Sequence, residues 1–289
     1  MEGLGRWDAV ALTNPLFKEA EDAARKIGYV LDPTKPAETV AYLCGQPGLG
    51  KTNAIKAALA AAGLVGLFRK IANPNDLIAA FDEASDLGQP LILEESDSVF
   101  LSPGQVNILK LATDQAGRRE ITARLPEIDE DTGKSRTVVR TVSLTAPLIV
   151  TSNKDLRNPA SFDKKMRDHI AALVSRSKPV YLGAAVPVQW EYACYLAICK
   201  GMIERPDEAN LAPIAVQNAA LEWFTVNLNR LADGSPRTLK EICKFISYNP
   251  GDRSVWERDL RPSLVNREAP DFRPPRGIMP KITETEGEA

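Results

Sequence analysis

The segment GQPGLGKT, residues 45–52, constrains the fold of this chain more than any other feature of its sequence. It follows the apolar run TVAYLC and opens KTNAIKAALAAAG, a run rich in helix-forming residues that stops at Gly63. The pattern G-x-x-x-x-G-K-[ST] between a strand and a helix is typical of a phosphate-binding loop, because its glycines let backbone N–H groups point inward at an anion. We therefore predict a strand, a phosphate loop and a helix over residues 39–63.

Each part of this loop has a defined chemical task. Lys51 is expected to reach the terminal phosphates of ATP, and the Thr52 hydroxyl is expected to coordinate Mg²⁺ at the positive end of the helix. A glycine-rich turn could match the pattern by chance, but the strand before it and the helix after it argue against this alternative. The predicted nucleotide-binding residues are Gly45, Gln46, Pro47, Gly48, Leu49, Gly50, Lys51 and Thr52.

Strand-like and helix-like runs alternate after Thr39, which predicts an α/β fold with a mostly parallel sheet flanked by helices. One helix is expected to begin at Asn73–Pro74 and to stop at Gly88. Another is expected to begin at Ser102, with Gln105 completing a capping box, and to stop at Gly117. The predicted strands lie in TVAYLC, VGLFRKIA, PLILEE, PLIVTSN and PVYL.

Two regions interrupt the alternation. The runs REITARL and TVVRTVSL flank the polar segment DEDTGKS, which predicts a β-hairpin inserted at residues 118–144. After Val186 three helical runs replace the strands. We therefore predict an N-terminal helical segment (1–38), a nucleotide-binding core (39–185), a small helical domain (186–248) and an extended or disordered tail rich in proline, arginine and acidic residues (249–289).

Composition excludes several classes of site. His169 is the only histidine, so a multi-histidine metal site is excluded. The four cysteines, at positions 44, 194, 199 and 243, have no C-x-x-C spacing and predict neither a zinc site nor a redox pair. The net charge is −2, so any contact with nucleic acid has to be a local patch. No apolar stretch is long enough to cross a bilayer, and no signal sequence begins the chain, so we expect a cytoplasmic protein without a membrane partner.

The apolar run LIL at residues 91–93 leads directly into Glu94, Glu95 and Asp97. Acids that cap the following turn would explain this structurally. A phosphate loop, however, also needs a carboxylate for the metal and a base for the attacking water. We assign Glu94 to Mg²⁺, which it would hold through a water molecule, and Glu95 to the attacking water. A shifted register, with Glu95 at the metal and Ser96 as base, is chemically poorer, and the loosely matching FDEASD at residues 81–86 has helical spacing.

Together, GQPGLGKT and LILEESDSVF resemble the AAA+ ATPases, whose second motif usually reads as apolar residues followed by Asp-Glu-x-Asp. Glu94 departs from this pattern, since it places the metal carboxylate one methylene further from the backbone. The resemblance covers roughly residues 39–248. It implies an α/β nucleotide core with a helical lid, Mg²⁺-dependent ATP hydrolysis, and a homo-oligomeric ring, for which we expect six subunits.

The resemblance also implies three further catalytic residues. Asn153, at the end of PLIVTSN, matches the first sensor that orients the lytic water, although an asparagine capping the next turn would look the same. Arg176 in VSRSKPVYL matches the arginine finger that completes a neighbour's site, with Arg167 as the alternative. Arg237 in GSPRTLKEI matches the second sensor, against the alternative of a surface arginine.

The hairpin bears on the substrate. It resembles the pre-sensor-1 insertion of superfamily 3 and minichromosome-maintenance helicases and of MoxR-type ATPases, and Lys134 and Arg136 at its turn are the predicted nucleic-acid contacts. The compact chain is similar to small phage or plasmid replication ATPases. We predict a ring-forming ATPase acting on single-stranded or duplex DNA as a helicase, helicase loader or replication factor. The alternative is a MoxR-like chaperone that remodels a protein client. The hairpin charges are six basic and five acidic: Arg118, Arg119, Arg124, Lys134, Arg136 and Arg140 against Glu120, Glu127, Asp129, Glu130 and Asp131.

Overall fold

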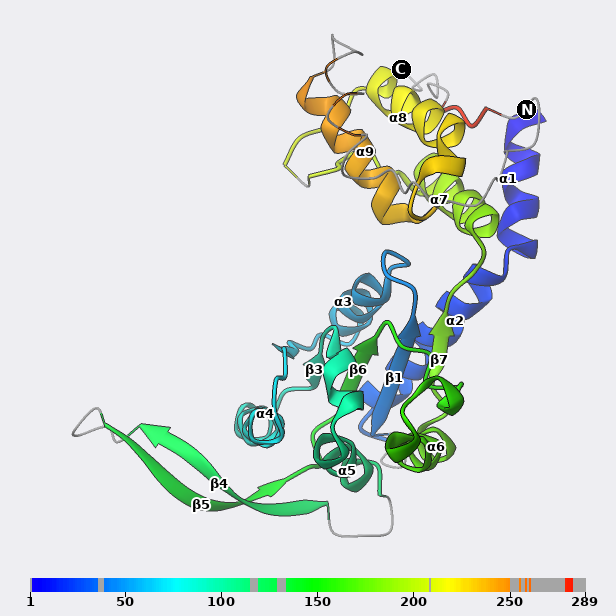
Figure 1. Ribbon diagram of the computed structural model, residues 1–289. Helices are drawn as coiled ribbons and strands as arrows, with labels where there is room; N and C mark the ends of the chain where they lie inside the picture. Colours follow the sequence, from blue (N-terminus) through cyan, green and yellow to red (C-terminus); the bar gives the residue numbers. More distant parts are fainter. Residues whose placement is uncertain are drawn as a thin grey trace. The chain divides into compact units, whose positions relative to one another are not determined.

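The computed structural model of the chain describes residues 2–35, 39–114, 119–128, 134–207, 209–249, 255, 258, 260 and 279–282. The chain forms two compact units (Figure 1). The sheet unit comprises Glu19–Gln46 and Lys51–Leu182, and the helical unit comprises Met1–Lys18, Pro47–Gly50 and Gly183–Ala289. Among the described residues, no helix has the length and apolar character needed to span a membrane.

The sheet unit is built on five parallel strands, which confirms the predicted α/β fold with a parallel sheet. Their order is β2-β3-β6-β1-β7, so β1 and β6 lie side by side and pair from Val40↔Leu148 to Cys44↔Ser152. Both of these strands are buried along their whole length, as expected of strands covered on two faces. The strands are β1 (Val40–Gly45), β2 (Leu67–Arg69), β3 (Leu91–Leu93), β6 (Leu148–Ser152) and β7 (Val180–Leu182).

Helices cover the sheet (Figure 1). Alternate residues of β1, such as Tyr42, belong to a core that includes side chains of α4, α5 and α6. On the side of Ile92, α3 supplies Leu59, since both side chains approach Gly66. The helices are α2 (Pro15–Leu31, of which residues 19–31 belong to this unit), α3 (Lys51–Ala61), α4 (Pro74–Leu87), α5 (Pro103–Ala112) and α6 (Lys164–Ser177), with the short 3₁₀ helices η1 (Ser96–Leu101) and η2 (Pro159–Ser161).

The helix starts show which capping signals the fold uses. Asn73 caps α4 in a full capping box with Asp76, and Gly88 ends α4 in the left-handed conformation. Ser102 caps α5 by accepting from the Gln105 N–H, but the Gln105 side chain does not return the bond. Gln105 is buried instead, with its Nε2 atom unpartnered, so only the serine half of the predicted box forms.

The predicted hairpin consists of β4 (Glu120–Ile128) and β5 (Ser135–Ser143), which pair in antiparallel register from Glu120↔Ser143 to Ile128↔Ser135. It projects from the sheet unit past α4 (Figure 1). Leu125 and Val142 on its inner face are buried in the core of the sheet unit and anchor it. Arg118 and residues 129–133, which include Asp129, Glu130 and Asp131, lie outside the described residues.

The helical unit packs around Trp190, Trp223 and Phe224. The first helix was not predicted as a separate element, and its Trp7 and Val10 are buried in this core. Its elements are α1 (Glu2–Thr13), α7 (Val186–Lys200), α8 (Ile214–Val226), η3 (Leu228–Arg230) and α9 (Pro236–Tyr248).

Within residues 249–289, the structure describes Asn249, Val255, Arg258, Leu260 and Met279–Ile282, while the remainder of the predicted tail lies outside the described residues. Leu260 is fully buried in the core of the helical unit. Asn218 of α8 exchanges two hydrogen bonds with the backbone of Ile282, at 3.1 and 2.8 Å. Leu260 and Ile282 therefore pack on the helical unit.

Candidate nucleotide-binding site

The phosphate loop follows β1 at the carboxyl edge of the sheet. Gly45, Gly48 and Gly50 all have positive φ angles, of 127°, 79° and 88°. At Gly45 the constraint is also spatial, because a Cβ atom would lie 1.9 Å from the carbonyl oxygen of Leu182 on the neighbouring strand. The Gln46 N–H donates to that same carbonyl at 2.9 Å. Only glycine fits at position 45, and β7 fixes where the loop leaves the sheet.

Lys51 folds back into the loop. Its ammonium group donates to the carbonyl oxygens of Gly45 and Gln46 at 2.5 and 2.9 Å, and to Oδ1 of Asn153 at 3.2 Å. The ammonium group therefore lies between the loop and the end of β6. Phosphate oxygens are stronger acceptors than neutral carbonyls for such a donor, so this position suits the contact predicted for Lys51.

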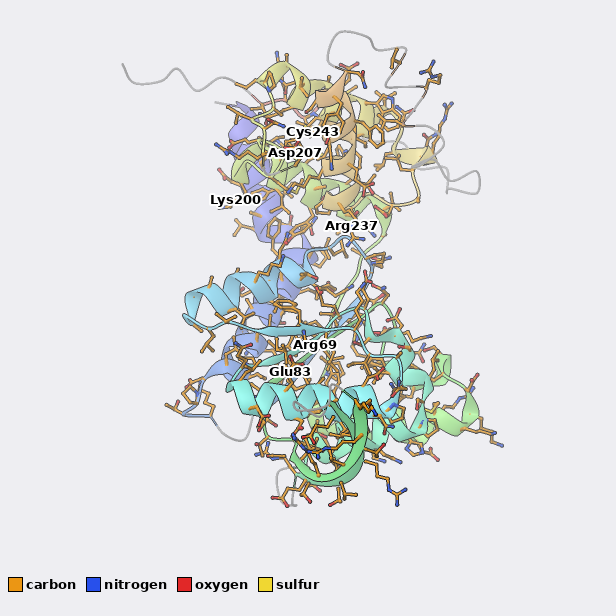
Figure 2. All side chains as sticks on the ribbon, turned by 90° about the vertical axis from the view of Figure 1, so that its left-hand side faces the viewer. Arg69, Glu83, Lys200, Asp207, Arg237 and Cys243 are labelled. Atoms are coloured by element: carbon orange, nitrogen blue, oxygen red, sulfur yellow. The ribbon has the colours of Figure 1, made fainter. Side chains whose placement is uncertain are left out.

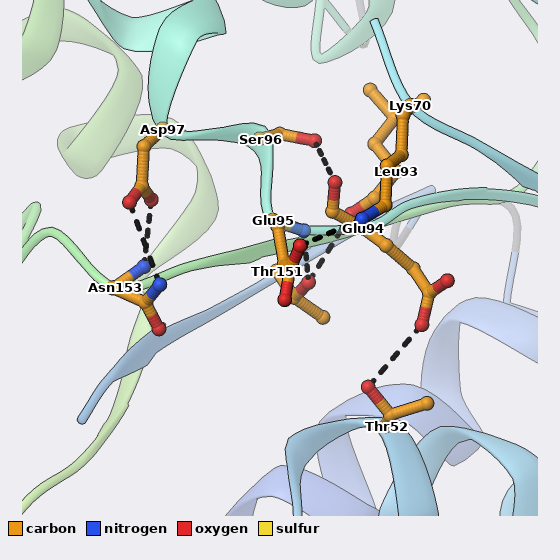
Figure 3. Close-up of polar contacts among 9 residues, drawn as sticks. All are labelled: Thr52, Lys70, Leu93, Glu94, Glu95, Ser96, Asp97, Thr151 and Asn153. Atoms are coloured by element: carbon orange, nitrogen blue, oxygen red, sulfur yellow. Dashed lines mark hydrogen bonds and ion pairs between the residues drawn. The ribbon is translucent and has the colours of Figure 1, made fainter. Parts of the chain in front are cut away.

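Thr52 and Glu94 supply two hard oxygen ligands. Their side chains point toward one another, with Thr52 Oγ1 3.3 Å from Glu94 Oε1 (Figure 3). Adjacent ligands in an octahedral Mg²⁺ site lie roughly 3 Å apart, because each metal–oxygen bond is about 2.1 Å. The residues present thus fit the predicted metal. Ser96 is 1% exposed and donates to the Glu94 carbonyl oxygen at 3.3 Å, which disfavours the register that makes Ser96 the base.

Glu95 has an unusual backbone conformation at the start of η1. Its φ and ψ angles of 48° and 40° are left-handed, a region that most non-glycine residues avoid. The Glu95 N–H donates to Thr151 Oγ1 of β6 at 3.1 Å, which holds this turn against the sheet. As a result the Glu95 carboxylate is exposed beside Glu94 rather than buried with β3 (Figure 3).

Lys70, which the sequence did not single out, is the partner of Glu95. Its Nζ atom lies 2.7 Å from Glu95 Oε2, and the hydrogen bond to Glu95 raises the pKa of Lys70. Lys70 follows β2, and β2 pairs with β3, so the strand order brings the two side chains together. This ammonium group and a water molecule would compete for the same carboxylate.

Asp97 is a second residue whose role became clear only in the structure. Its Oδ1 atom accepts from Ser152 Oγ at 2.6 Å. Oδ1 also accepts from the Asn153 N–H at 2.7 Å, and Oδ2 accepts from Asn153 Nδ2 at 3.5 Å (Figure 3). These bonds fix the Asn153 amide with Oδ1 toward Lys51. Asp97 is the last residue of the motif LILEESD, so the signal for it was present in the sequence.

The thiol closest in sequence to the loop carries no charge. Burial raises the pKa of Cys44 to about 12, so this side chain is protonated at neutral pH. Cys44 therefore adds no negative charge beside Lys51, Glu94, Glu95 and Asp97.

The three predicted arginines are placed separately. Arg176 lies exposed in the last turn of α6, and its Nη1 atom donates to the Lys110 carbonyl oxygen at 3.3 Å. Arg167 lies earlier in α6 and donates to the Phe162 carbonyl oxygen at 3.0 Å. Arg237 lies in the first turn of α9 in the helical unit, where Ser235 caps the helix (Figure 2). The finger and second-sensor assignments stay predictions.

The basic residues of the hairpin are partly neutralised by acids. Arg136 pairs with Glu127 at 2.8 Å, and Arg140 pairs with both Glu127 at 2.5 Å and Asp82 of α4 at 3.0 Å. Hydrogen bonds from Arg136 and Arg140 lower the pKa of Glu127, so it stays ionised and holds both cations. Lys134 lies exposed just before β5. The predicted DNA contact of Arg136 would require it to leave Glu127.

Comparisons with known proteins give distant similarities. No protein-family model matches the chain. An uncharacterized 36.7 kDa protein in the nrdC-mobD intergenic region of Enterobacteria phage T4 is 26% identical over 223 residues, which is 74% of this chain and 65% of that protein. NtrX from Brucella abortus, solved in complex with ADP and with ATP, is 16% identical in both structures, with TM-scores of 0.47 and 0.45. These matches cover 83% and 80% of this chain, which spans 52% and 51% of the NtrX chains.

Proposed function

We propose that this chain is an AAA+ ATPase that hydrolyses ATP with Mg²⁺. One observation carries the proposal: the carboxyl ends of β1, β3 and β6 bring Lys51, Thr52, Glu94, Glu95 and Asn153 to a single edge of the sheet. Ligands of open parallel sheets bind at this edge. The set contains a cation for phosphates, a hydroxyl and a carboxylate for a metal, and a second carboxylate for a water molecule.

The residues of the chain divide the work of hydrolysis. Lys51 would hold the terminal phosphates, and Thr52 and Glu94 would hold Mg²⁺, which would neutralise phosphate charge when bound. Once Lys70 leaves the Glu95 carboxylate, Glu95 accepts the proton of the attacking water. Asn153, held by Asp97, orients that water. The second-sensor role of Arg237 belongs to the same proposal.

We further propose that the ATPase works as a ring of identical subunits, with Arg176 completing the site of a neighbour. Mixing two inactive variants tests this. In an equal mixture of Arg176→Ala and Glu95→Gln, some sites combine a normal Glu95 with a neighbour's normal Arg176. Half of the subunits carry a normal Glu95, and half of their neighbours carry a normal Arg176. Random assembly therefore predicts roughly one quarter of wild-type turnover. ATP turnover measured against the mixing ratio gives the answer.

The control for this mixture uses Arg167→Ala in place of Arg176→Ala. If Arg176 is the finger, Arg167→Ala keeps turnover when assayed alone. No recovery in the Arg176 mixture, with both variants folded and assembled by light scattering, would show that each subunit uses only its own residues.

We propose DNA as the substrate of the motor. The hairpin supports this, because its exposed outer face carries Arg124 and the pair Thr122 and Thr141, which share a hydrogen bond of 2.9 Å, beside the exposed apolar Val139. With Lys134 at the described start of β5, this face offers hydroxyls and cations to a phosphate backbone. The hairpin reaches out from the sheet unit (Figure 1), as a contact with a long polymer requires.

Stimulation of ATP turnover by single-stranded DNA tests the substrate. We expect turnover to rise severalfold with DNA, and the double change Lys134→Ala with Arg136→Ala to reduce this stimulation because two phosphate contacts are lost. A matched control, Lys56→Ala with Lys165→Ala, removes two exposed lysines from α3 and α6. Turnover that DNA leaves unchanged, at low and at physiological salt, would contradict the proposal.

A protein client is the second candidate, and one observation favours it. A groove of about 380 Å³ lies between α4 and the hairpin, and it is lined by four carboxylates and the single cation Arg140. The carboxylates are those of Asp82, Glu83, Asp86 and Glu127. This surface repels nucleic acid and suits a basic protein segment. A MoxR-like remodelling chaperone would use it, and its turnover would respond to a protein partner instead of DNA.

A further inference from the structure

A second pocket of about 430 Å³ lies in the sheet unit between α2 and the edge strand β7. Figure 1 shows α2 beside β7, and residues of both elements line the pocket. Its walls include four cations, two tyrosines and two carboxylates. These are Arg25, Lys26, Arg157 and Lys178, Tyr29 and Tyr181, and Glu19 and Asp22.

The pocket is positive in a chain whose net charge is −2. Its four cations against two carboxylates leave a lining charge of +2, and Asp155, which pairs with Arg157 from outside the lining, reduces this to +1. Arg25 is paired with Asp22 within the lining. The groove beside the hairpin has one cation against four carboxylates, or −3. Of these two pockets, only the one beside β7 attracts an anion. The pocket beside β7 is therefore a local positive patch of the kind that a nucleic-acid contact requires.

Each of the two rings has a cation over it: Arg157 of the pocket lining over Tyr181, and Lys35, which does not line the pocket, over Tyr29. The Arg157 guanidinium lies 4.2 Å from the centre of the Tyr181 ring. The Nε atom of Arg157 lies 3.1 Å from Oδ1 of Asp155, and this ion pair holds the guanidinium in place. Lys35 lies 4.0 Å from the centre of the Tyr29 ring. Aromatic rings stack on nucleobases and neighbouring cations bind the phosphates, a combination found in sites for single strands. A pocket for phosphate alone would not need the two rings.

Lys178 adds an independent observation. It ends α6 with a φ of 47°, and with Glu95 it is one of two non-glycine residues with positive φ in the described part of the chain. Glycine is the residue that favours this position at the end of a helix. A lysine here costs backbone energy, which is expected where the side chain has a task. Lys178 brings a positive charge to the lining of the pocket.

We propose that this pocket binds single-stranded nucleic acid, with Lys26, Arg157 and Lys178 on the phosphates and a base against Tyr29. The inference rests on the proposed action on DNA and adds a contact that is separate from the hairpin. A strand held here would lie along the edge of the sheet, while the hairpin would contact another part of the same strand.

Binding of a fluorescent single-stranded DNA of about 20 nucleotides, followed by anisotropy across a salt series, tests the proposal. Lys26→Ala with Lys178→Gly should weaken binding and lower the slope of log affinity against log salt by about 1.4, or about 0.7 for each lost contact. Lys178→Gly also relieves the backbone, so the melting temperature should not fall. Tyr29→Leu should weaken binding roughly tenfold, whereas Tyr29→Phe keeps the ring and should bind as the wild type does.

The control Lys56→Ala with Lys165→Ala removes the same charge elsewhere and should leave the salt slope unchanged. Unlabelled oligonucleotide should displace the probe at concentrations where inorganic phosphate and a mononucleotide do not. Displacement by phosphate alone would show a small-anion site and overturn the inference. If the double change Lys134→Ala with Arg136→Ala abolishes DNA binding while the pocket variants bind as the wild type does, the inference about the pocket is overturned and the proposed function stands. A wild type that binds no DNA would overturn both.

Discussion

Lys51→Ala is expected to abolish ATP binding. The Lys51 ammonium group lies between the loop carbonyls and Asn153, where it is the positive charge positioned for the terminal phosphates. Each charge-assisted hydrogen bond contributes roughly 1.5–3 kcal/mol, so losing two of them raises the Kd for Mg-ATP by at least about 100-fold. Isothermal titration calorimetry of wild type and variant with Mg-ATP measures the change.

Lys56→Ala is the matched control for this experiment, because Lys56 lies exposed on α3, five residues further along the same helix. It removes the same charge without touching the loop and should bind ATP normally. The melting temperature of Lys51→Ala should stay within a few degrees of the wild type. ATP binding by a folded Lys51→Ala protein at wild-type strength would refute the assignment of the phosphate loop.

Glu95→Gln is expected to bind ATP and fail to hydrolyse it. The amide has nearly the shape of the carboxylate but cannot accept the proton of the attacking water, and general-base catalysis contributes about 10²–10⁴-fold to such a rate. Thr52, Glu94 and Lys51 are unchanged, so the Kd for Mg-ATP should stay within a few-fold of the wild type. Steady-state turnover and calorimetry on the same preparation separate the two effects.

The ion pair with Lys70 needs its own control, because Glu95→Gln breaks it as well. Lys70→Ala also breaks the pair but keeps the carboxylate, so it should retain turnover. If Lys70→Ala loses turnover as completely as Glu95→Gln does, the ion pair and not proton transfer is what matters at Glu95. Normal turnover by Glu95→Gln would remove Glu95 from the role of base.

Much of the sheet unit could be predicted because its signals are local. The strands in TVAYLC and PLIVTSN stand out as short apolar runs, and the two alternating runs around a polar turn predicted the hairpin. The glycine spacing of the phosphate loop and the carboxylates after β3 are equally local. Residues that act within one segment can be found by spacing alone.

The contacts between segments could not be predicted in the same way. Lys70 meets Glu95 because β2 pairs with β3, and Asp97 meets Asn153 because η1 lies against the end of β6. No periodicity encodes the strand order that creates these pairs. The position of Gln105 could not be predicted either. Its spacing from Ser102 fits a capping box, but its side chain is buried in the core.

The two bonds of Arg140 have a mechanical consequence. Arg140 joins β5 to α4 through Asp82, and joins β5 to β4 through Glu127. The hairpin therefore cannot tilt away from α4 without breaking the bond to Asp82 or pulling the helix with it. Only Gly88, Gln89 and Pro90 separate α4 from β3, the strand that presents Glu94 and Glu95. Arg140 thus gives the hairpin a contact with the helix that leads directly into the strand carrying the two carboxylates.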